Sequence, residues 1–148
     1  MKFLNNNLAE LIGAIIGDGC ISYKPEIHQY FIEIVGNINE EKEYFEYLKD
    51  IIKNELNLKV SITVRERGLR LKVYSKKFIE FLINDLKLIP NKEKCQNISI
   101  PDKIMDHSVL LNHCLRGIMD TDGSLFFADK GYRNNYPTIE ISTTSFKL

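Results

Sequence analysis

Two nine-residue segments decide the fold: LIGAIIGDG at residues 11–19 and LRGIMDTDG at residues 115–123. They share leucine, glycine, aspartate and glycine at the first, third, eighth and ninth positions. Each segment has the pattern of a helix that ends in Asp-Gly, and each runs into residues typical of a strand. The repeat therefore predicts two equivalent units, each of which begins with a helix.

The glycines inside these helices predict close packing. Gly13 and Gly17 lie four residues apart, and Gly117 takes the place of Gly13 in the second segment. A glycine inside a helix costs about 1 kcal/mol relative to alanine, and close approach of another helix backbone is the usual compensation. We therefore expect the two helices to pack side by side, which would bring Asp18 and Asp122 together.

Hydrophobic periodicity predicts an α+β fold with antiparallel sheets. Helices are expected over residues 7–19, 40–56, 76–88 and 109–122, the last capped by Ser108, and strands over residues 20–24, 29–37, 58–67, 69–75, 124–128 and 138–144. The order predicts a complete αββαββα repeat over residues 1–90, a linker over residues 91–107 and an incomplete second repeat over residues 108–148.

One surface of this fold is expected to be basic. The chain has a net charge of zero, yet residues 58–77 carry seven Lys or Arg and only one Glu. Alternation along the hairpin at residues 58–75 places apolar residues on one face and basic residues on the other. Such a face favours a nucleic-acid partner, and a merely solvated face is the simpler alternative. The residues predicted to contact DNA are Ser22, Lys24, Arg65, Arg67, Arg70 and Lys72.

The two repeated acids predict a metal site. Two carboxylates at close range repel each other, and a divalent cation relieves that repulsion. Oxygen ligands suit Mg²⁺, and the partial negative charge at a helix C-terminus also favours a cation. Asp18 and Asp122 are therefore candidate metal ligands and catalytic residues for metal-assisted phosphodiester hydrolysis. The alternative is that Asp-Gly is ordinary turn chemistry at a helix–strand junction.

The two segments and the αββαββα order resemble those of the LAGLIDADG homing endonucleases. The resemblance implies a saddle of β-sheets that straddles double-stranded DNA, with the motif helices forming the interface between its halves. It implies that Asp18 and Asp122 bind Mg²⁺ and direct cleavage of both strands across the minor groove. It also places Lys94 at the position of an active-site lysine and Asn37 near that of a polar residue that organises water.

The second unit departs from this pattern, because the chain ends at Leu148 before any hairpin equivalent to residues 58–75. We expect either a truncated protein or a second chain that completes the sheet, through a homodimer or strand exchange. Two kinds of function therefore stay open. The first is a site-specific endonuclease, and the second is a derived nucleic-acid-binding module, such as an RNA maturase or DNA-binding regulator, or a cleavage-deficient remnant.

The remaining features concern location. No apolar run approaches the roughly 20 residues that a membrane span needs, so a membrane partner is not expected. The three cysteines are widely spaced and lack a CxxC pair, which fits a reducing cytoplasm better than a disulfide framework. The sequence has no terminal Cys or His-Asn pair of the kind that self-splicing needs. A free-standing protein, an intron-encoded protein associated with intron homing, or an excised domain is therefore expected rather than an intein.

Overall fold

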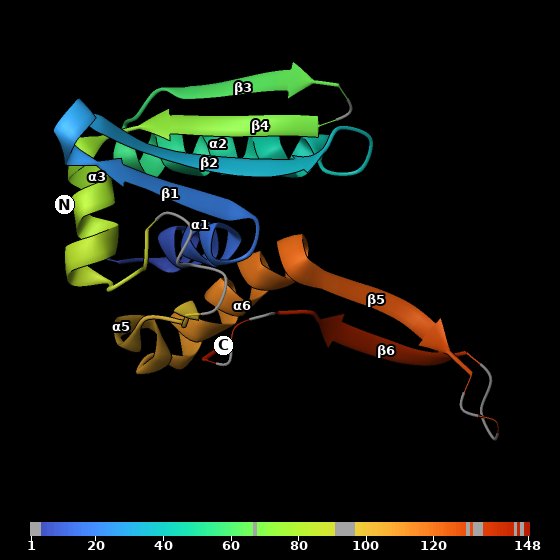
Figure 1. The fold of residues 1–148 in the computed structure, drawn as a ribbon. Coiled ribbons are helices and arrows are strands. Elements are labelled where there is room, and N and C mark those ends of the chain that lie inside the picture. Colours follow the sequence, from blue (N-terminus) through green and yellow to red (C-terminus); the bar gives the residue numbers. More distant parts are fainter. Residues whose placement is uncertain are drawn as a thin grey trace.

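The computed structural model describes residues 4–66, 68–90, 97–129, 131, 135–143, 145, 147 and 148. Its α+β fold confirms the predicted class (Figure 1). In chain order the elements are α1 (Asn6–Ile16), β1 (Gly19–Lys24), η1 (Pro25–Ile27), β2 (Gln29–Asn37), α2 (Lys42–Leu56), β3 (Val60–Arg65), β4 (Gly68–Tyr74), α3 (Lys76–Glu80), η2 (Phe81–Asp85), α5 (Asp102–Met105), α6 (Ser108–Asp122), β5 (Gly123–Ala128) and β6 (Tyr136–Ile141).

The first helix, α1, carries the first repeated segment. Asn5 caps it, because the Asn5 side-chain oxygen accepts a hydrogen bond of 2.9 Å from a backbone N–H of the first turn. The helix ends at Ile16, earlier than the sequence predicts, and the Gly17 N–H closes it by donating to the Gly13 carbonyl. Asp18 therefore lies just beyond the helix and directly before β1.

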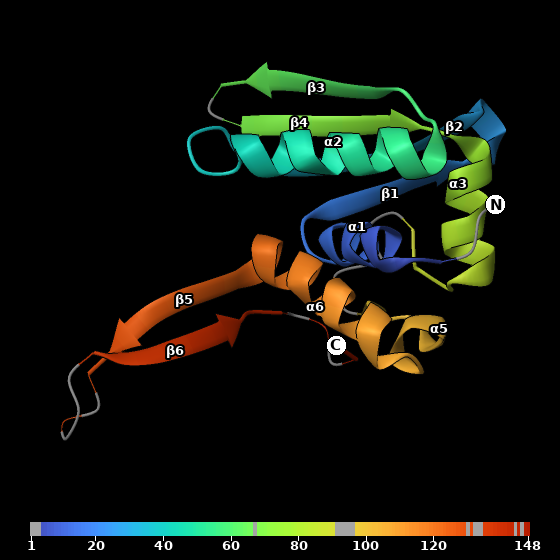
Figure 2. The ribbon, with the colours of Figure 1, turned by 180° about the vertical axis from the view of Figure 1, so that it is seen from behind.

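The first four strands form one antiparallel sheet in the order β1-β2-β4-β3. Its register pairs Ile21 with Ile32 and Ile34 with Leu71, so these apolar side chains share one face. The helix α2 lies against one face of the sheet, and no helix of the described residues covers the opposite face (Figures 1 and 2). That open face is called the outer face below.

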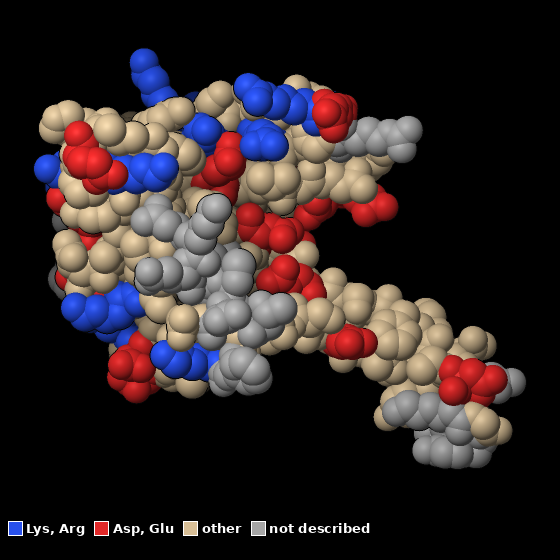
Figure 3. Space-filling model, viewed as in Figure 1, with Lys and Arg blue, Asp and Glu red and all other residues tan. Residues whose placement is uncertain are grey.

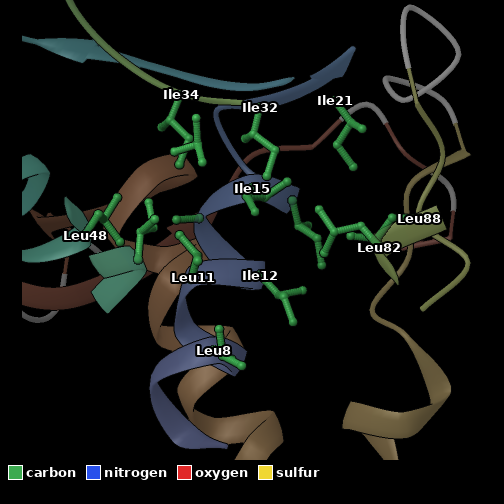
Figure 4. Close-up of a cluster of buried hydrophobic side chains, with 14 of the residues drawn as sticks. Leu8, Leu11, Ile12, Ile15, Ile21, Ile32, Ile34, Leu48, Leu82 and Leu88 are labelled. Carbon is green, nitrogen blue, oxygen red and sulfur yellow. The ribbon is translucent and has the colours of Figure 1, made fainter. Parts of the chain in front are cut away.

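The hydrophobic core surrounds α1 and fixes its position. Figure 4 shows side chains from α1, the sheet, α2 and the segment after α3 converging on one cluster: Leu8, Leu11, Ile12, Ile15, Ile21, Ile32, Ile34, Leu48, Leu82 and Leu88. Full burial of one such side chain contributes about 1.5–3 kcal/mol. The core therefore holds the end of α1, and with it Asp18, in a defined place relative to the sheet.

The second repeated segment also leads into a pair of strands, but these strands lie in a different environment. α6 leads into β5 and β6, which form a separate two-stranded antiparallel sheet that extends away from the body (Figure 1). Leu125 pairs with Ile139 in this hairpin, as Ile21 pairs with Ile32 in the first unit. However, Leu125 and Ile139 are 65% and 71% exposed, whereas Ile21 and Ile32 are each 3% exposed. The apolar face of β5 and β6 is thus largely uncovered.

Several boundaries differ from the sequence prediction. The helix expected over residues 76–88 divides into α3 and the π-helical η2, where the Leu86 N–H donates to the Phe81 carbonyl five residues earlier. A short helix, α5, lies inside the predicted linker. α6 begins at Ser108 itself, so His107 and not Ser108 occupies the N-cap position. The division of the chain into one complete and one incomplete repeat stays a prediction.

No helix in the described ranges has the length and apolar character required to cross a membrane.

Candidate active site and nucleic-acid interface

The helices α1 and α6 pack directly against each other through two glycines. A Cβ atom added at Gly13 would lie less than 3.0 Å from the Cys114 carbonyl oxygen, and one added at Gly117 would lie less than 3.0 Å from the Glu10 carbonyl oxygen. Because both neighbours are backbone atoms, a side chain at either glycine would push the helices apart. The structure therefore places both glycines in the helix contact that the sequence predicts.

The same contact brings the ends of the two helices together. A Cβ atom added at Gly17 would meet the Thr121 side chain and would lie 3.3 Å from Asp122 Oδ2. Thr121 is held to its own helix because its hydroxyl donates to the Gly117 carbonyl at 3.0 Å. Asp18 directly follows Gly17, so both repeated acids lie at one end of the helix pair, Asp18 exposed and Asp122 half-buried.

This end of the helix pair has the donor chemistry for a divalent cation. Carboxylates are hard oxygen donors, and the backbone dipole adds partial negative charge at a helix C-terminus. Mg²⁺ keeps several waters and takes only one or two protein carboxylates. Among the described residues, no group of three or more His, Cys, Asp and Glu could hold a metal ion. Asp18 and Asp122 are the repeated carboxylates at this end of the helix pair.

Two other predicted catalytic residues have different outcomes. Lys94 lies outside the described residues. Asn37 is exposed at the end of β2, where its side-chain oxygen accepts a 2.9 Å hydrogen bond from the Asn39 N–H. Gly19 pairs with Ile34, so Asn37 lies at the same end of the sheet as the end of α1. It is three residues beyond Ile34, about 10 Å further along the strand.

The predicted DNA-contacting residues divide into three groups. Lys24 and Arg65 are exposed, and Arg70 and Lys72 are half-buried on the outer face of β4. Arg67 lies outside the described residues. Ser22 corrects the prediction, because it is buried and its hydroxyl accepts a 2.9 Å hydrogen bond from Gln29 Nε2. The alternation of β1 places Ser22 on the outer face, but its side chain is buried there and bonded to Gln29.

Sequence reasoning missed an acid in the middle of the outer face. Glu33 on β2 pairs with Lys72 across the ladder. One of its carboxylate oxygens, Oε1, lies 3.2 Å from Lys72 Nζ and 3.5 Å from Arg70 Nη1. The alternation of β2 could have indicated this acid, because Ile32 and Ile34 point inward and Glu33 between them must point outward.

A buried acid was also missed. Glu10 is 1% exposed in α1, and Tyr47 donates a 3.1 Å hydrogen bond to its carboxylate. Arg116 Nε lies 3.5 Å from Glu10 Oε1, and His113 Nδ1 lies 3.8 Å from Oε2. Burial, and after it the nearby acids, raise the pKa of Tyr44 and keep its hydroxyl protonated. These partners come from α2 and α6, so no local sequence pattern indicates the cluster.

The surface is hollowed beside the helix ends. Figure 3 shows a wide recess between the four-stranded sheet and the β5–β6 hairpin. Acidic side chains gather at its inner end, and Lys and Arg side chains lie over β3 and β4 with acidic side chains nearby.

No protein-family model and no curated protein matches the sequence. Solved structures do match. One is a variant of I-DmoI bound to its target DNA, nicked in the coding strand, with manganese. It is 23% identical with a TM-score of 0.57, and the match covers 80% of this chain and 62% of that chain. A second variant with target DNA and manganese, and I-DmoI with DNA and calcium, have the same identity and TM-score and are covered over 61% and 58% of their chains.

I-DmoI is a LAGLIDADG homing endonuclease. This chain has the LAGLIDADG homing-endonuclease fold. The described residues supply a four-stranded sheet, the α1–α6 contact and the separate β5–β6 hairpin. The chain spans about three fifths of the length of the I-DmoI structures that it matches.

Proposed function

We propose that this chain belongs to the LAGLIDADG homing endonucleases and acts as a site-specific endonuclease on double-stranded DNA. The observation that carries the proposal is the glycine-mediated contact between α1 and α6, which supports a paired position for Asp18 and Asp122 beside a recess. The likeness to structures that contain DNA and divalent metals supports the same function. A DNA-binding module without cleavage explains the sheet equally well but gives no reason for two acids at the helix ends.

In this proposal Asp18 and Asp122 hold one or more divalent cations, and Mg²⁺ is the expected ion. When bound, such a cation stabilises charge on the scissile phosphate and lowers the pKa of a coordinated water. The two carboxylates would hold the cation at the end of the helix contact, and the packed glycines fix how the two helices lie against each other there. Lys94 and Asn37 are proposed to assist at the phosphate and at the attacking water, as the family resemblance implies.

DNA binding is assigned to the outer face and its edges. Four basic residues of the described chain lie on this surface: Lys24, Arg65, Arg70 and Lys72. The sequence predicts that Arg67 belongs to the same surface. Lys and Arg can contact phosphate oxygens and the guanine O6 and N7 atoms in the major groove. Ser22 is left out of this assignment, because it is buried and bonded to Gln29.

We further propose that residues 1–90 form one complete repeat and residues 108–148 part of a second. A second copy of the chain is the proposed partner for the hairpin, either by packing of the two hairpins or by strand exchange. Uncovered Leu125 and Ile139 support this, because their counterparts Ile21 and Ile32 are buried under helices. An exposed two-stranded sheet is also unstable alone and offers free edges for pairing.

The expected compartment is a reducing one such as the cytoplasm. Cys20 and Cys114 are both free thiols, which is the state that a reducing compartment maintains.

A library of randomised DNA duplexes tests the proposed function. The protein is incubated with the library and Mg²⁺, cut molecules are sequenced, and light scattering gives the mass of the same sample. The expected result is cutting of both strands at one recurring sequence, which EDTA abolishes. Sequence-selective, salt-sensitive binding without any cutting, in the presence of Mg²⁺ or Mn²⁺, would contradict the endonuclease and favour a binding module.

A further inference from the structure

Glu33 is an acid placed where the outer face is otherwise basic. It lies on β2, one of the two central strands of the sheet, and the register sets it between Cys20 on β1 and Lys72 on β4. One carboxylate oxygen serves both Lys72 at 3.2 Å and Arg70 at 3.5 Å. The three side chains therefore form one compact group, which is called the Glu33 cluster below.

The Glu33 cluster is poorly suited to bind phosphate alone. A carboxylate repels the DNA backbone, and it cancels one of the two positive charges beside it. Affinity that comes from phosphate contacts increases with the number of free cations and is independent of sequence. An acid at the centre of the face therefore lowers the affinity for DNA of any sequence. Its presence is explained if it contributes a selective contact instead.

The cluster is also held in place before any ligand arrives. Lys72 Nζ lies 4.2 Å above the centroid of the Phe31 ring and 6.0 Å from that of Tyr74. The two rings contact each other with centroids 5.6 Å apart. Lys72 is thus fixed by a carboxylate on one side and by an aromatic face on the other. Groups that are already ordered lose less entropy when they bind, so their positions can select a partner.

The chemistry of base edges identifies what such a cluster can select. In the major groove, cytosine presents the N4 amino donor, which a carboxylate accepts. Adenine also presents an amino donor, but its N7 acceptor lies beside that donor and repels a carboxylate. Guanine presents only the acceptors O6 and N7, which suit Arg70 or Lys72.

We propose that Glu33 determines sequence selectivity by accepting a hydrogen bond from a cytosine N4 amino group, with Arg70 or Lys72 on the guanine of the same or the adjacent base pair. This deepens the proposed function and rests on it, because it assumes that the outer face meets duplex DNA. In the free protein the Glu33 carboxylate lies against Arg70 and Lys72. In the complex it would also accept a hydrogen bond from the cytosine.

The test compares wild type, Glu33→Gln and Glu33→Ala in selection of bound duplexes from a randomised library, at several salt concentrations. Glu46→Gln is the matched control, because Glu46 forms an ion pair of 2.6 Å with Lys49 on α2. Urea unfolding of each variant verifies that it is folded. The wild type is expected to require a C·G pair at one position, with roughly tenfold preference over other bases.

Glu33→Gln is expected to move that preference to adenine, because glutamine pairs with adenine N6 and N7. Glu33→Ala is expected to lose the preference while binding random duplex more tightly, with a steeper salt dependence. If both variants keep the wild-type base preference at every position, Glu33 does not select a base. The inference then fails, while the proposed function still stands. If the wild type itself does not bind duplex DNA, the proposed function fails and the inference fails with it.

Discussion

Gly13 and Gly117 occupy reciprocal positions in the contact between α1 and α6, because each lies against the backbone carbonyl of the residue three places before the other. Gly13 meets Cys114, and Gly117 meets Glu10. The two contacts are related to each other as they would be by a local two-fold axis between the helices. This relationship explains why the two segments of the repeat share glycine at the third position, and it fixes the relative place of the acids that follow.

This relationship predicts that Gly13→Ala and Gly117→Ala each destabilise the protein. A methyl group would press on a backbone carbonyl that cannot move without separating the helices, and overpacking of this kind costs about 1–3 kcal/mol. The free energy of urea unfolding measures the effect. Gly68→Ala is the matched control, because a Cβ atom there has its nearest neighbour at 3.6 Å. Equal stability of all three variants would contradict the proposed packing.

The buried Glu10 predicts a further stabilising contact, which joins α1 to α2. Tyr47→Phe removes the 3.1 Å hydrogen bond to the Glu10 carboxylate. Hydrogen bonds to charged groups contribute about 1.5–3 kcal/mol, so a loss near the lower end of this range is expected for a partly exposed tyrosine. Tyr74→Phe, on the outer face, is the control in the same unfolding measurement and is expected to leave stability unchanged. A Tyr47→Phe variant as stable as wild type would refute this role.

The uncovered hairpin predicts self-association. If a second copy covers Leu125 and Ile139, the mass from light scattering should increase with concentration above the 17.2 kDa of one chain. Leu125→Lys and Ile139→Lys should return the protein to the mass of a monomer. Ile27→Lys changes another strongly exposed apolar residue outside the hairpin and should have no effect. A wild type that stays monomeric at all concentrations would exclude the second copy as partner.

The buried thiol of Cys114 predicts how stability depends on pH. Burial raises the pKa of Cys114 from an ordinary 9.0 to about 12. The folded protein therefore keeps this proton more tightly than the unfolded chain does. The stabilisation is complete below pH 9 and is lost as the pH rises from about 9 to about 12.

Urea unfolding between pH 8 and pH 11 measures this loss, which has a slope of about 1.4 kcal/mol per pH unit for one group. Cys114→Ala should flatten the decline, and Cys20→Ala should not, because Cys20 is exposed. The half-buried Tyr44, whose pKa is also raised by burial, adds a loss in the same direction at higher pH. An identical decline in both cysteine variants would contradict the assignment to Cys114.

Much of the fold follows from sequence patterns, because hydrophobic periodicity reports which face of an element is buried. The alternation of residues 58–75 predicts the outer positions of Arg70 and Lys72, which the ladder register reproduces. The pairing of β2 with β4 depends on contacts between segments far apart in the chain, so the place of Glu33 beside Lys72 required the structure. The same reason applies to Glu10, whose partners lie on α2 and α6.

The central claim is that Asp18 and Asp122 together form the cleavage site. The most direct measurement is cleavage of the selected duplex, with each strand labelled, by Asp18→Asn, Asp122→Asn and the control Asp120→Asn, alongside binding of the uncut duplex. Asp120 lies two residues from Asp122 and pairs with Arg116 at 3.6 Å, and it is not one of the four positions that the two segments share. The account predicts that the first two variants bind the duplex but cut at least about 100-fold more slowly, the order of effect of losing a catalytic group, while Asp120→Asn cuts normally. Cleavage that survives both Asp18→Asn and Asp122→Asn would contradict it.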